Sequence, residues 1–104
     1  MEKNNKILSY IGLAKRAGKC LSGEEKVLNK IRSNEAKLVI IASDASDNTS
    51  KKFKDKCSSY HVPLIQYNNR SQLGQSLGEA ERVVIAITDD GFVKMIMNCM
   101  EKEM

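Results

Sequence analysis

Two apolar runs constrain the fold of this 104-residue chain more than any other feature. They are KLVIIA at residues 37–42 and RVVIAIT at residues 82–88. Both are rich in β-branched side chains and show little alternation of apolar and polar positions. A strand of this kind is covered on both faces, as in a sheet that lies between two layers of helices. The chain is therefore predicted to place a sheet at the centre of its structure.

Segments with helical periodicity alternate with these runs. Helices are predicted over residues 3–17, 23–34, 49–60, 71–77 and from 90 onward, with further extended segments at residues 19–21 and 62–67. This order predicts an α/β protein, a three-layer α/β/α sandwich with a mixed sheet of about four strands. The length fits one domain over residues 1–104.

Two helix starts carry recognisable caps. Ser22 and Glu25 have the spacing of a capping box, which predicts that Ser22 caps a helix beginning near Gly23. Asp89 and Asp90 precede the final helix, where the helix dipole and unpaired amides favour acidic residues. Capping is therefore the preferred interpretation of these two carboxylates, over an acid–base pair.

Positive charge is concentrated in the first third of the chain. Residues 1–37 contain nine Lys and Arg against four acids, whereas residues 38–104 contain eight against nine. Such a distribution favours a local surface for a polyanion, with an ordinary solvated surface as the alternative. The polar start and the lack of a long apolar run predict a cytoplasmic protein that makes no contact with a membrane.

Catalytic and metal-binding patterns are weak throughout the chain. His61 is the only histidine, and its neighbours in the sequence offer no carboxylate or thiol. Cys20, Cys57 and Cys99 are odd in number and widely separated, which favours neither a disulfide framework nor a zinc site. We therefore expect no catalytic residue, no metal and no cofactor. An enzyme acting on a small phosphorylated or nucleotide substrate is therefore the least favoured functional hypothesis, behind RNA binding and protein–protein interaction.

The segment from Lys15 to Asn29 is the strongest candidate for binding. With Val27, Leu28 and Ile31 facing the core, the outward side of the second helix carries Glu25, Lys26, Asn29 and Arg32. A mixture of acid, amide and cations can hydrogen-bond base edges as well as neutralise phosphates. A solvated helix face is the alternative that the spacing leaves open.

Six ordered segments resemble the L7Ae/L30e ribosomal protein family, and most closely its bacterial YlxQ-like branch. They are Gly12–Lys19, Ser22–Glu25, Ala36–Ala42, Leu73–Gly74, Leu77–Gly78 and Arg82–Thr88. Proteins of this family are α/β/α sandwiches that bind kink-turn RNA, a sharply bent helix with sheared G·A pairs. The resemblance implies the same fold and the same kind of ligand for this chain.

The resemblance also implies which residues contact RNA. The family reads the G·A pairs with a Gly-x-Asn-Glu-x-x-Lys motif, and here Gly23 is retained while Glu25, Lys26 and Asn29 replace the last three motif residues. In the family, apolar residues of a second loop cover the flipped bulge nucleotide, which here implies a role for Ala80. The predicted RNA-binding residues are Lys15, Lys19, Gly23, Glu24, Glu25, Lys26, Asn29, Ala80 and Arg82.

The sequence therefore predicts a non-enzymatic, monomeric RNA-binding protein. Its expected partner is a structured, kink-turn-like RNA, with ribosomal RNA as one candidate. The alternative is a protein–protein interaction module on the same fold, in which the outward face of the second helix or the acidic residues at 79–90 contact a partner protein.

Overall fold

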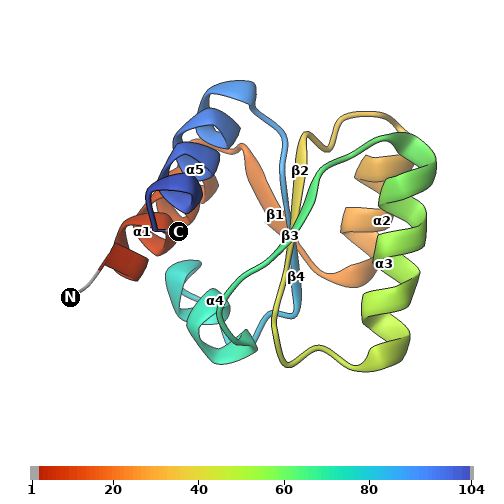
Figure 1. Cartoon of the computed structure of the whole chain (residues 1–104), viewed down its shortest axis with the longest axis horizontal. Helices are drawn as coiled ribbons and strands as arrows, with labels where there is room; N and C mark the ends of the chain where they lie inside the picture. Colours follow the sequence, from red (N-terminus) through yellow and green to blue (C-terminus); the bar gives the residue numbers. More distant parts are fainter. Residues whose placement is uncertain (1–2, 104) are drawn as a thin grey trace.

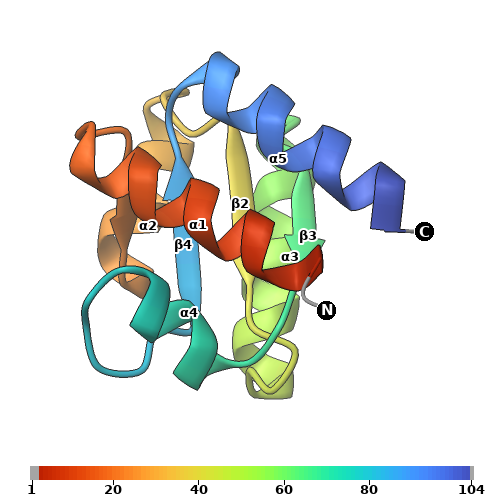
Figure 2. The ribbon, with the colours of Figure 1, turned by 90° about the vertical axis from the view of Figure 1, so that its left-hand side faces the viewer.

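A four-stranded sheet lies between two layers of helices in the computed structural model, which describes residues 3–103 and the side chains of residues 6–102 (Figure 1). The elements in chain order are α1 (Lys3–Arg16), β1 (Cys20–Ser22), α2 (Glu24–Arg32), β2 (Leu38–Ile41), α3 (Asp47–Tyr60), β3 (Leu64–Gln66), α4 (Arg70–Ser76), β4 (Val84–Ile87) and α5 (Asp90–Glu103). The helices α1, α4 and α5 cover one face of the sheet (Figure 2), and α2 and α3 cover the other. The predicted three-layer sandwich is confirmed.

The sheet is mixed, as the sequence predicts. Its strand order is β1-β4-β2-β3, with β4 antiparallel to both of its neighbours and β3 parallel to β2. Ile40 of β2 pairs with Ile85 of β4, so the two apolar runs lie side by side in the centre. The two central strands are buried at every position.

Alternate residues of β2 and β4 supply two separate cores. Ile40 and Ile85 point toward α1, α4 and α5, where they pack with Ile11. Val39 and Ala86 belong to the opposite core, formed with α2 and α3. Because both faces are covered, every position of these strands is apolar, which explains the absence of alternation in the sequence.

Of the two helix caps that the sequence predicts, one is confirmed and one is wrong. Asp89 caps α5, since its carboxylate accepts a hydrogen bond from the N–H of Phe92 at 3.0 Å. The capping box predicted at Ser22 is wrong. Ser22 is the last residue of β1 and pairs with Ile85. Gly23 is the N-cap, and α2 starts at Glu24, one residue later than the capping box predicts. Pairing with β4 holds Ser22 in the sheet and removes it from the capping position.

Shortening a buried side chain of a central strand should destabilise both the sheet and the core that the side chain enters. We expect Ile40→Ala to lower the free energy of unfolding by about 2–4 kcal/mol, because the side chain is fully buried. Urea unfolding followed by circular dichroism measures this change. Leu13→Ala on α1, where the side chain is 42% exposed, is the control and should cost much less. Equal losses in the two variants would contradict the assignment of Ile40 to the core.

Candidate nucleic-acid interface

The N-terminus of α2 begins without a side-chain cap. Gly23 is the N-cap residue, with φ of 103° and ψ of 141°, and within the described residues no side-chain cap hydrogen bond is formed there. This backbone conformation strongly favours glycine, which explains why Gly23 ends the strand-to-helix connection. The first turn of an α-helix carries amides without intrahelical partners, together with a partial positive charge. An acceptor supplied by a ligand can therefore bind at the start of α2.

The outward face of α2 is the one that the sequence predicts. Val27 and Ile31 are buried against the sheet. The residues predicted to face outward, Glu25, Lys26, Asn29 and Arg32, are all exposed. The amphipathic pattern therefore places an acid, an amide and two cations on one accessible surface.

Glu24 contacts α3. Its carboxylate accepts a hydrogen bond from Lys52 Nζ at 2.9 Å and another from the Thr49 hydroxyl at 3.3 Å. The hydrogen bond from Lys52 lowers the pKa of Glu24 below its ordinary value. Glu24 therefore links α2 to α3, which is a structural role that the sequence motif does not indicate.

A charged cluster lies beside the α2 terminus. Lys15 of α1 donates from Nζ to Glu79 Oε2 at 2.6 Å and to the carbonyl oxygen of Leu77 at 3.1 Å. Arg82 forms an ion pair with the other oxygen of Glu79 at 3.1 Å. These three side chains and Lys26 line one cavity of about 210 Å³. The fold thus brings together Lys15, Lys26 and Arg82, which are far apart in the sequence.

The loop from Gly78 to Arg82 is hydrogen-bonded to α4 through its backbone. The N–H of Glu79 donates to the carbonyl of Gly74 at 2.9 Å, and the N–H of Arg82 donates to the carbonyl of Arg70 at 3.0 Å. A Cβ atom on Gly74 would overlap the carbonyl oxygen of Ala80, so the loop can only approach a glycine here. Ala80 itself is exposed. Its methyl group is therefore accessible from solvent.

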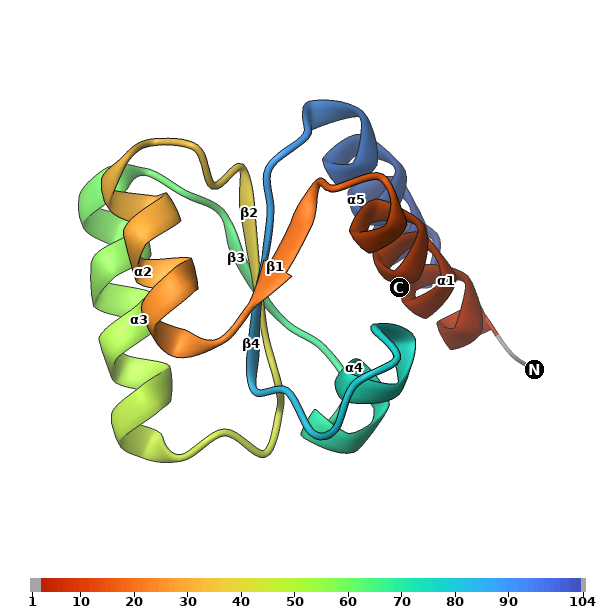
Figure 3. The same ribbon diagram turned by 180° about the vertical axis from the view of Figure 1, so that it is seen from behind.

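Lys19 lies at the other end of β1 from Gly23. The carbonyl of Lys19 accepts from Thr88, just after β4, whereas the N–H of Gly23 donates to Val84 at the beginning of β4. Lys19 and Gly23 thus mark opposite ends of β1. Figure 3 shows this strand running from the α1 connection to the start of α2. Lys19 is also absent from the residues that line the cavity with Lys15 and Lys26.

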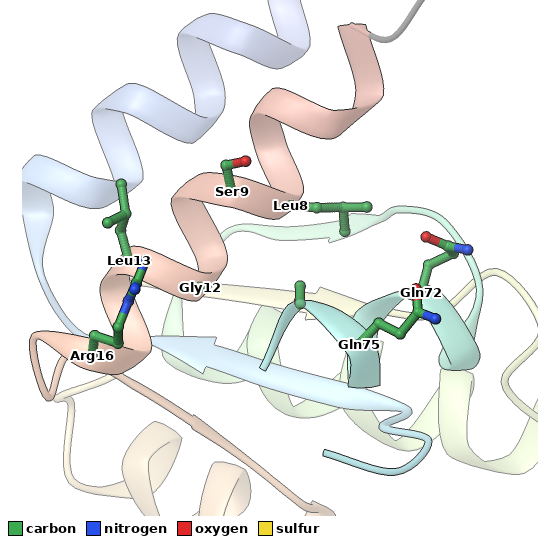
Figure 4. A pocket seen from close by; sticks show the side chains of 8 residues that line it. Leu8, Ser9, Gly12, Leu13, Arg16, Gln72 and Gln75 are labelled. Atoms are coloured by element: carbon green, nitrogen blue, oxygen red, sulfur yellow. The ribbon is translucent and has the colours of Figure 1, made fainter. Parts of the chain in front are cut away.

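A shallow groove extends the surface along α1 and α4. It is lined by Leu8, Ser9, Leu13 and Arg16 of α1 and by Gln72 and Gln75 of α4, among others (Figure 4). Gly12 allows the two helices to approach, since a Cβ atom there would lie 2.8 Å from the carbonyl oxygen of Ser76. A smaller hollow lined by Arg16, Lys15 and Leu77 connects the groove with the cavity at the charged cluster.

Cys20 lies in the wall of the cavity at the charged cluster. Burial raises the pKa of the Cys20 thiol to about 12, so this cysteine is not a thiolate nucleophile at neutral pH. His61 is exposed at the C-cap of α3, far along the chain from the cluster. Within residues 3–103, no group of three or more potential ligand residues could hold a metal ion, and no helix has the length and apolarity of a membrane span.

The fold and surface define a small α/β/α protein with a mixed polar and cationic surface at one helix terminus. The sequence profile of the ribosomal protein L7Ae/L30e/S12e/Gadd45 family matches residues 5–97. The chain belongs to this family.

Individual relatives agree with this assignment. The RNA-binding protein YlxQ of Bacillus subtilis strain 168 is 46% identical over 91 residues, which is 88% of this chain and 91% of that protein. YlxQ of Enterococcus faecium is 44% identical over 96 residues, or 92% of each chain. A solved structure of a protein of unknown function from Bacillus halodurans C superposes with a TM-score of 0.88 at 43% identity, covering 92% of this chain and 97% of the other. The predicted likeness to the YlxQ-like branch is confirmed.

The ion pair of Glu24 predicts a pH-dependent contribution to stability. The folded-state pKa of Glu24 is lowered, so the stabilisation is present above the unfolded-state pKa and is lost as the pH falls through the folded-state value. We expect Glu24→Gln to lower the free energy of unfolding at pH 7 by less than about 1 kcal/mol. The difference from wild type should shrink in acid.

Glu25→Gln is the matched control for this measurement, because Glu25 lies in the same first turn of α2 and, among the described residues, forms no ion pair. Urea titrations of all three proteins across a pH series measure the effect. An effect of Glu24→Gln that is the same at every pH, or matched by Glu25→Gln, would contradict the role of the Lys52 pair.

Proposed function

We propose that this protein binds structured RNA of the kink-turn type through the outward face of α2 and the adjacent charged cluster, without catalysing a reaction. The observation that carries this proposal is the uncapped start of α2 beside Lys15, Lys26 and Arg82. The naming of the YlxQ relatives as RNA-binding proteins supports it.

The outward face of α2 supplies the contacts that would distinguish one RNA from another. The Glu25 carboxylate can accept hydrogen bonds from guanine amino groups, which an opened groove with sheared G·A pairs exposes. The Asn29 amide can both donate to and accept from a base edge. Because both side chains extend from a helix, the backbone that carries them needs no reordering on binding, and the entropic cost is limited to their own rotamers.

Cations around the same helix supply contacts that do not depend on RNA sequence. Lys15 and Arg82 can neutralise phosphates at the charged cluster, and Lys26 can do so from α2. Ala80 presents an apolar surface to an unstacked nucleotide. Lys19 would contact only RNA that extends to the other end of β1. The protein then stabilises a bent RNA, such as a ribosomal or other structured RNA, by matching its shape and charge.

The first experiment compares two RNAs of equal charge. We expect a labelled kink-turn RNA to bind more tightly than a plain duplex at two salt concentrations, because only the kinked RNA opens its G·A pairs to α2. Both affinities should fall as salt rises, since phosphate neutralisation releases counterions. Equal and weak binding of the two RNAs would contradict the proposal and favour a protein partner for the same face.

Two single substitutions on α2 should have different signatures. Glu25→Ala should weaken kink-turn binding by about tenfold without weakening duplex binding, because it removes a base contact. Lys26→Ala should weaken binding of both RNAs by similar factors and reduce the salt slope by about one, because it removes a phosphate contact. Fluorescence titrations of both RNAs at several salt concentrations measure these effects.

Lys54→Ala is the control for the loss of one charge, because Lys54 is exposed on α3, outside the proposed interface. It should leave both affinities within about twofold. Thermal unfolding should be nearly unchanged in the three variants. Indistinguishable effects of Lys26→Ala and Lys54→Ala would show that net charge, and not the α2 face, determines binding.

A further inference from the structure

Glu79 is paired with two of the cations to which the proposed function assigns phosphate contacts. Its two carboxylate oxygens are shared between two cations, with Lys15 on one oxygen at 2.6 Å and Arg82 on the other at 3.1 Å. Lys15 and Arg82 come from different elements, and both belong to the residues predicted to contact RNA. A carboxylate and a phosphodiester present similar pairs of acceptor oxygens to such a fork of donors.

We propose that the position of the Glu79 carboxylate is a phosphodiester subsite, and that Glu79 is an internal anion that RNA must displace from Lys15 and Arg82. This inference rests on the proposed function and adds a specific site and a competing residue to it. Part of the positive charge of the cluster is thereby compensated while the protein is free.

The cavity supports the subsite. Lys15, Lys26, Glu79 and Arg82 all line it, and among the described residues Glu79 is the only acid in its lining. The hydrogen bond and charge of Lys15, together with the charge of Arg82 and a smaller effect of Lys26, lower the pKa of Glu79. An anion in this position therefore interacts with three cations.

Displacement of Glu79 requires no movement of the backbone. The loop remains attached to α4 through the Glu79 N–H and the Arg82 N–H, which bond to carbonyls of that helix. The Glu79 side chain is 37% exposed and Lys15 is 39% exposed, so rotation about the side-chain bonds can move the carboxylate into solvent. Exposed ion pairs of this kind are weak enough for a polyanion to replace.

The test uses Glu79→Gln, which keeps the size of the side chain and its capacity to hydrogen-bond while removing the negative charge. We expect this variant to bind both the kink-turn RNA and the duplex roughly fivefold more tightly than wild type, since two weak ion pairs no longer compete. The salt slope should become steeper by about one, because no freed carboxylate takes up a cation when RNA binds.

Glu81→Gln is the matched control. Glu81 is an exposed acid two residues away in the same loop, and the described part of the chain offers its carboxylate no ion-pair partner. It changes net charge by the same amount, and we expect it to alter affinity by less than about twofold. Equal gains from Glu79→Gln and Glu81→Gln would overturn the subsite in favour of a general charge effect. Weaker binding by Glu79→Gln would also overturn it, because Glu79 would then serve to position the cations.

A second variant tests whether the gain depends on the cluster. In a Lys15→Met background, Glu79→Gln should improve RNA binding by less than half of the factor seen in the wild-type background, because one of the two ion pairs is already absent. An undiminished gain would overturn the proposal.

The wild-type titration distinguishes failure of the proposed function from failure of the subsite. If wild type binds neither RNA, the proposed function fails, whereas normal wild-type binding with no gain in Glu79→Gln rejects only the subsite.

Discussion

The pairing of β2 with β4 is the interaction on which the rest of this structure depends. These strands lie at the centre of the sheet, antiparallel, with Ile40 opposite Ile85, and both are buried on both faces. Two cores follow, because alternate side chains of one strand must enter opposite helix layers. Loss of this pairing would remove the surface against which the helices of both layers pack.

The same central strand also positions the candidate interface. β1 pairs with the other edge of β4, and its last residue, Ser22, leads directly into Gly23 and α2. The loop that enters β4 carries Glu79 and Arg82, so it necessarily lies near the end of β1 where α2 begins (Figure 3). The close contact between Gly74 and the carbonyl oxygen of Ala80 then fixes how near that loop lies to α4. Residues from α1, α2 and the loop therefore converge through strand pairing.

Ion pairs reduce the number of basic side chains in the N-terminal third that are available to a polyanion. Lys15 is paired with Glu79, and Lys30 is paired with Glu35 at 2.8 Å, whereas Lys26 on the outward face of α2 forms no ion pair within the described residues. A count of charges along the sequence treats these lysines alike. Their availability to a polyanion differs, because some are held by an acid that the fold places beside them.

The sequence by itself determined the element order, the buried central strands and the outward face of α2, because each depends on periodicity within a short segment. It also determined the family, through ordered motifs spread along the whole chain. Only the tertiary structure decided that Ser22 belongs to β1, that Glu24 bonds α3, that Lys19 lies at the far end of β1, and that Glu79 joins Lys15 to Arg82. These outcomes depend on contacts between residues far apart in the sequence, and strand pairing, which local periodicity does not encode, sets those contacts.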